Sequence, residues 1–260
     1  MKKPKILYKY YSLDKKTTDS GFSCYEGVKG LIKENKIYFP SLKELNDPFE
    51  ANPQYSLNGI GAFINTLKLI KRDHPDISIC NIGLFKDLIK NRKKYEAIMK
   101  KSIDDRMDKI RIFCTTSIPD SILMWSHYAN GHKGICVGFD VSESSEISKI
   151  TSALFKKVSY SDVYPTINPD PNIKKQVEKL FYTKYVDWKY EKEWRSVVKD
   201  DREFQLPEGV IKCIILGGKV DVSDLNDIKD WLKGRTDKLE IKKATVNSDN
   251  YKINIDPFNF

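Results

Sequence analysis

Hydrophobic and polar positions follow two kinds of spacing along the chain, and the two kinds do not alternate regularly. Apolar residues that alternate with polar ones, or that form short β-branched and aromatic runs, predict strands. These runs occupy residues 5–11, 36–41, 110–117, 131–140, 154–163, 192–199, 210–218, 238–246 and 251–256. Apolar residues three or four apart predict helices at 25–35, 119–130, 172–184 and 221–234, and two more between 57 and 109.

This order predicts an α+β fold with a mixed, mostly antiparallel sheet, because strict strand–helix alternation would be needed for a doubly wound parallel sheet. The length of 260 residues fits a single domain, residues 1–260, with a basic helical insertion at about 57–109. In the helix at 221–234 we expect Ser223 as the N-cap and Gly234 as the stop. No Gly-rich phosphate-binding motif follows any predicted strand.

Charge adds one further feature to this picture. The net charge is +9, and residues 68–111 hold 13 basic and 7 acidic side chains, an excess of +6. Such a segment can attract nucleic acid, or it can be a solvated helical surface rich in Lys. No apolar run approaches the roughly 18 residues of a membrane span, and the N-terminus lacks a signal-peptide pattern, so we expect a cytoplasmic protein without a membrane partner.

The stretch Trp188–Arg195 (WKYEKEWR) places two Glu in the most aromatic part of the chain. If it is extended, Trp188, Tyr190 and Trp194 share one face with Lys192, and the carboxylates of Glu191 and Glu193 share the other with Lys189 and Arg195. A solvated, salt-bridged strand explains this pattern, and so does a site that holds negative charge against a positive centre.

Two other stretches concentrate chemistry. MWSHYANGHKG (124–134) holds Trp125, His127, Tyr128 and His132. On a helix the two His would point about 140° apart, which is not a zinc-binding spacing, so we expect no metal there. LNDPFE (45–50) gathers Asn46, Asp47 and Glu50 around a Pro turn.

Together these blocks resemble a known family. LYKYYS (7–12), IYFPSLKELNDPFE (37–50), FCTTSIPDSILMWSHYANGHKGICVGFD (113–140), VSYSDVYP (158–165) and DWKYEKEWRSVV (187–198) are similar, in order, to the signature blocks of domain-of-unknown-function family 2971. The resemblance implies a prokaryotic protein of phage-defence or mobile-element context, such as an abortive-infection or toxin effector with an operon-encoded partner.

The order of motifs also resembles the ADP-ribosyltransferase plan with its split sheet. That resemblance implies an NAD-consuming transferase or glycohydrolase, in which Glu193 stabilises the oxocarbenium-like ribose and Glu191 orients or deprotonates the acceptor. The implied NAD-binding residues are Lys9, Tyr10, Asn46, Trp125, His127, Tyr128, His132 and Arg195. The first strand carries Lys and Tyr where the plan has Arg or His, and no Ser-Thr-Ser motif stands in the middle.

Two alternatives remain open. One is a non-enzymatic module that senses a nucleotide or a phage protein, with the aromatic blocks in the core and the Glu pair bound to Arg195. The other is a metal-dependent nuclease in which Asp47, Glu50, Glu191 and Glu193 gather around Mg²⁺.

Overall fold

The computed structural model describes residues 3–16, 23–50, 107–142, 145–151, 153–167, 173–237 and 239–260, with isolated positions between 52 and 105. The chain divides into two compact units. The first unit contains residues 1–40, 111–158 and 187–260, and the second contains residues 41–110 and 159–186. The predicted helical insertion at 57–109 lies largely outside the described residues.

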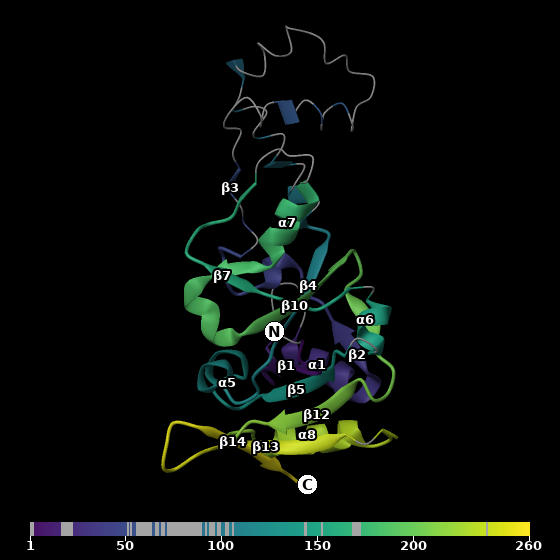
Figure 1. The fold of residues 1–260 in the computed structure, drawn as a ribbon. Coiled ribbons are helices and arrows are strands. Elements are labelled where there is room, and N and C mark those ends of the chain that lie inside the picture. Colours follow the sequence, from purple (N-terminus) through teal and green to yellow (C-terminus); the bar gives the residue numbers. More distant parts are fainter. Residues whose placement is uncertain are drawn as a thin grey trace. The chain divides into compact units, whose positions relative to one another are not determined.

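An eight-stranded sheet forms the centre of the first unit, and its order does not follow the sequence (Figure 1). From one edge to the other the strands are β14 (Ile253–Pro257), β13 (Glu240–Val246), β12 (Ile211–Leu216), β5 (Ile135–Asp140), β1 (Ile6–Tyr11), β4 (Ile110–Thr116), β10 (Glu193–Lys199) and β6 (Lys156–Lys157). The β12–β13 pair is parallel. The pairs β1–β4, β1–β5, β5–β12, β13–β14 and β6–β10 are antiparallel. A second ladder joins β2 (Lys36–Tyr38) and β11 (Glu203–Gln205).

Helices cover both faces of this sheet. One face packs against α1 (Cys24–Glu34), α6 (Glu146–Ile150) and α8 (Val222–Leu232), whose buried residues join Leu7, Phe113 and Val137 in what we call the first core. The other face packs against α5 (Ile122–Tyr128) and forms the second core, which includes Tyr10 and Trp125. Successive residues of a strand point to opposite faces, so β1 contributes to both cores.

The second unit has short elements in its described part. β3 (Gln54–Tyr55) pairs in parallel with β8 (Thr166–Ile167), and β7 (Ser159–Ser161) pairs in parallel with β9 (Thr183–Tyr185). The α-helix α7 (Ile173–Phe181) and the 3₁₀ helix η1 (Leu42–Glu44) accompany them. The single strand predicted at 154–163 is wrong, since β6 and β7 divide this stretch between two sheets.

The α+β class and the mixed, mostly antiparallel sheet are confirmed. The N-cap of α8 is Asp221 rather than Ser223, while Gly234 follows the C-cap with a φ of 90°, a left-handed value that suits glycine. Among the described helices, none combines the length and apolar character that a membrane crossing requires.

Candidate functional site

The strand β10 begins at Glu193 and brings a buried ion pair onto the sheet. Trp194 and Val198 pack against the first core, so alternation places Glu193 and Arg195 on the opposite face. The Arg195 guanidinium donates to both carboxylate oxygens of Glu193, with Nε–Oε1 at 2.7 Å and Nη2–Oε2 at 2.8 Å. Arg195 is 0% exposed and Glu193 is 3% exposed. The pair is therefore a charge-assisted, bidentate contact inside the protein.

The strand predicted at 192–199 corresponds to β10, but Glu191 does not belong to it, so the condition that 188–195 is extended throughout is not met. Residues Val186–Glu191 form the 3₁₀ helix η2, and Lys192 has a left-handed φ of 47° that separates it from β10. The Thr116 hydroxyl donates to the backbone carbonyl of Glu191, and the Ser117 amide donates to that of Lys192. These bonds to the end of β4 stabilise the turn at Lys192. Because of this turn, Glu191 and Glu193 do not lie on one strand face as expected.

The turn brings Glu191 to an aromatic surface that we call the aromatic–histidine cluster: His127, Tyr128, Tyr190 and Glu191. The Tyr128 hydroxyl donates to a carboxylate oxygen of Glu191, which is 2% exposed. His127 Nδ1 lies 3.0 Å from the Tyr190 hydroxyl. The His127 ring is 6.4 Å from the Tyr128 ring and 6.0 Å from the Tyr190 ring, nearly edge-on to both.

Exposure differs within the aromatic–histidine cluster. His127 is exposed and both Tyr rings are half-buried, so solvent reaches the rings while the carboxylate lies behind them. The short helix α5 supplies His127 and Tyr128, and η2 supplies Tyr190 and Glu191. Sequence reasoning did not single out Tyr190 as a site residue. Its position in the same aromatic stretch as Glu191 was the available signal.

Trp125, Tyr10 and His132 lie beside the cluster as structural support. Trp125 is 0% exposed and its indole N–H donates to the Pro119 carbonyl at 2.9 Å. The Tyr10 ring meets it edge-on, with centroids 5.1 Å apart, and the half-buried His132 ring stacks on it at 6.2 Å. Burial, aided by the nearby Lys219 charge, lowers the pKa of His132. Buried side chains such as Tyr10 and Trp125 cannot stack on a ligand without moving.

Lys9 points into the first core, away from the aromatic–histidine cluster. Its ammonium donates to the Cys114 carbonyl at 3.1 Å and lies 4.8 Å from the centroid of the Phe113 ring. Burial lowers the pKa of Lys9. The expected contact of Lys9 with a pyrophosphate would require the side chain to leave these partners.

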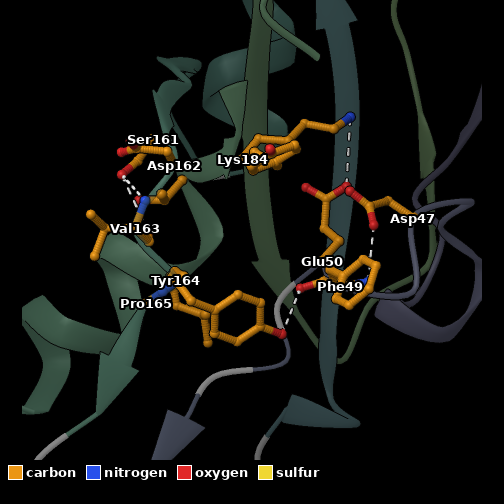
Figure 2. A pocket seen from close by; sticks show the side chains of 12 residues that line it. Asp47, Phe49, Glu50, Ser161, Asp162, Val163, Tyr164, Pro165 and Lys184 are labelled. Carbon is orange, nitrogen blue, oxygen red and sulfur yellow. Dashed lines mark hydrogen bonds and ion pairs between the residues drawn. The ribbon is translucent and has the colours of Figure 1, made fainter. Parts of the chain in front are cut away.

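The second unit holds the other carboxylates singled out in the sequence. Asn46 is exposed, whereas Asp47 and Glu50 line a pocket with Lys184 of β9 (Figure 2). Sequence reasoning did not identify Lys184, since its contact with Glu50 joins residues separated by about half of the chain. Within the part of the chain that the structure describes, no group of three or more His, Cys, Asp or Glu side chains could hold a metal ion.

Comparisons with known proteins bear on one segment of the chain. No curated protein and no solved structure matches the chain. Residues 124–196 match the family model described as "Protein of unknown function (DUF2971)". The matched segment contains most of α5, all of η2 and the start of β10, and it includes all four residues of the aromatic–histidine cluster. The resemblance to domain-of-unknown-function family 2971 is thus confirmed over residues 124–196.

Proposed function

We propose that the protein is a binding module that recognises NAD or a related nucleotide through the aromatic–histidine cluster and does not consume it. The observation that carries this proposal is the bidentate Glu193–Arg195 pair, in which both side chains are buried. Of the two Glu, Glu193 is thereby held in a structural ion pair, as expected of a binding module, whereas Glu191 bonds to Tyr128.

The Glu193–Arg195 pair argues against a catalytic role for Glu193, because an oxocarbenium-like centre needs a carboxylate whose charge is available to it. A carboxylate stabilises such a transition state only if its charge faces the reacting carbon more strongly there than in the ground state. Both oxygens of Glu193 accept hydrogen bonds from one guanidinium, so its charge is already balanced. Glu193 therefore fits a structural role better than a catalytic one.

The cluster itself has the chemistry of a nucleotide contact. The exposed imidazole of His127 and the ring of Tyr190 offer flat surfaces on which a base can stack. Their polar atoms, 3.0 Å apart, can exchange hydrogen bonds with ribose hydroxyls in place of each other. Glu191 orients Tyr128 from behind, so it fixes the shape of the cluster.

One observation favours a second candidate, an NAD-consuming enzyme of the ADP-ribosyltransferase type. Tyr128 joins the buried Glu191 carboxylate to the cluster through its hydroxyl. In that reaction the bond between ribose and nicotinamide breaks, the acceptor oxygen bonds to the ribose carbon, and the acceptor's proton passes through Tyr128 to Glu191. The reacting carboxylate would then be Glu191 rather than Glu193.

Calorimetric titration with NAD, followed by chromatography of the same sample, separates the two candidates. We expect NAD to bind the wild-type protein, and His127→Ala and Tyr190→Ala each to weaken binding about tenfold or more, the scale of a lost stacking contact. Tyr251→Ala is the matched control, because Tyr251 is 99% exposed on the β13–β14 hairpin. Nicotinamide release that disappears in Glu191→Gln would establish the enzyme instead, and absence of any nucleotide binding would overturn both candidates.

A further inference from the structure

A pocket in the second unit has a composition unlike the rest of this basic chain. It is a small hollow of about 50 Å³, and Figure 2 shows several of the side chains around it. Its lining residues are Asp47, Phe49, Glu50, Ser161, Asp162, Val163, Tyr164, Pro165, Leu180, Thr183, Lys184 and Tyr185. All of them belong to the second unit.

Negative charge dominates this lining although the chain carries +9 overall. The lining includes three carboxylates, those of Asp47, Glu50 and Asp162, and one ammonium, that of Lys184. Asp47 is 7% exposed, and the side chains of Glu50 and Lys184 are 2% and 5% exposed. Glu50 Oε2 lies 3.6 Å from Lys184 Nζ, which is an ion pair too long for a good hydrogen bond. The pocket therefore has an excess of two negative charges with two of its carboxylates removed from solvent.

Aromatic rings form the other part of the wall. Phe49 and Tyr164 stand almost perpendicular, at 87°, with centroids 6.5 Å apart. The Tyr164 hydroxyl donates to the Phe49 carbonyl at 3.3 Å, and the Phe49 amide donates to the Asp47 carboxylate at 2.9 Å. Phe49 is nevertheless 67% exposed and Tyr185 is 50% exposed. Local hydrogen bonds thus fix the backbone of an aromatic corner in which the Phe49 ring is open to solvent and the Tyr164 ring is half-buried.

We infer that this pocket binds the head of a small organic cation, an alkylated ammonium group. Ring faces attract such a cation through their quadrupoles, and carboxylates nearby balance its charge, which is the pattern of ammonium-binding aromatic cages. A divalent metal fits less well, because Lys184 lies beside Glu50 and the described residues offer no three-ligand group. The inference concerns a different unit from the nucleotide cluster and does not depend on its function.

Choline and its uncharged isostere 3,3-dimethylbutan-1-ol test this inference by calorimetric titration of the full chain. We expect choline to bind and the alcohol of the same shape to bind at least tenfold more weakly. An acetylated, amide-capped trimethyllysine is titrated in parallel. Tighter binding of trimethyllysine than of choline would identify a protein side chain as the source of the ammonium, and the reverse would identify a free small molecule. Equal affinity for choline and the alcohol, or no binding of any ammonium probe, would overturn the inference.

Variants locate the binding in the pocket. Asp47→Asn keeps the oxygen that accepts from the Phe49 amide and removes one charge, so we expect choline affinity to fall about tenfold. Lys184→Gln removes the competing ammonium and should tighten binding, an effect that mere damage to the fold would not produce. Asp249→Asn, an exposed position in the first unit, is the matched control. Unchanged affinity in both pocket variants, with melting curves like those of the wild type, would contradict the assignment.

Discussion

Replacing Arg195 with Met should destabilise the first unit strongly. The substitution places an apolar Met side chain in a site that is 0% exposed. It removes both hydrogen bonds to Glu193, a residue that is only 3% exposed. Removing one partner of a buried ion pair costs about 3–5 kcal/mol, because the remaining carboxylate loses its guanidinium partner but stays out of water. At about 1.4 kcal/mol per factor of ten, the unfolding equilibrium shifts by roughly two to four orders of magnitude.

Urea denaturation followed by tryptophan fluorescence measures this effect in the relevant unit. All four Trp of the chain, at 125, 188, 194 and 231, lie in the first unit, so their emission reports its unfolding. With a urea slope of about 2–3 kcal/mol per M, the midpoint should fall by about 1–2.5 M.

The double variant Glu193→Leu with Arg195→Met is the decisive comparison. Replacing both charges with apolar groups of similar volume is often neutral or stabilising, so most of the lost stability should return. A loss below about 1 kcal/mol in the single variant would refute the reasoning, because that is the scale of a solvated surface pair. A double variant no more stable than the single one would refute it equally.

Three further predictions test other parts of the first unit. Gly134→Ala should lower stability by about 1–3 kcal/mol or more in urea denaturation, since its Cβ would lie 2.0 Å from the Tyr11 carbonyl oxygen; wild-type stability would contradict this clash. The His132 imidazole should show a pKa below 6.5 in NMR titration. As the pH falls below 6.5, His132 is protonated more readily in the unfolded chain than in the folded one, so the wild type should lose more stability than His132→Gln. Burial lowers the folded-state pKa of Lys9 below 10.5, so the stability of the wild type relative to Lys9→Met should rise as the pH approaches 10.5. A stability difference that does not change with pH would contradict this burial effect.

The fold of the first unit was largely predictable from local pattern. Strands such as β1 and β12 combine β-forming residues with alternation, and α1 carries its apolar residues at helical spacing. The irregular order of these elements pointed correctly to an α+β sheet. What pattern could not provide was the division of 154–163 between two sheets, because short charged runs such as Lys156–Lys157 pair through tertiary context rather than propensity.

The candidate site was predicted less completely. Alternation placed Glu193 and Arg195 on one face, as the structure shows, but a left-handed Lys192 removed Glu191 from that face. The positive φ of the non-glycine residue Lys192 is stabilised by tertiary hydrogen bonds to the end of β4, and the local sequence does not predict it. The contact between Glu50 and Lys184 was invisible for the same reason, since it joins distant parts of the sequence.

The most direct test of the central proposal is a titration of NAD into the wild-type protein and into the Tyr190→Ala variant, with nicotinamide measured in the wild-type sample afterwards. The proposal predicts saturable binding to the wild type, at least tenfold weaker binding to the variant, and no nicotinamide above the protein-free control. Equal affinity in the two proteins would contradict the assignment of the cluster. Release of nicotinamide that requires Glu191 would contradict a binding-only role and establish the buried carboxylate as catalytic.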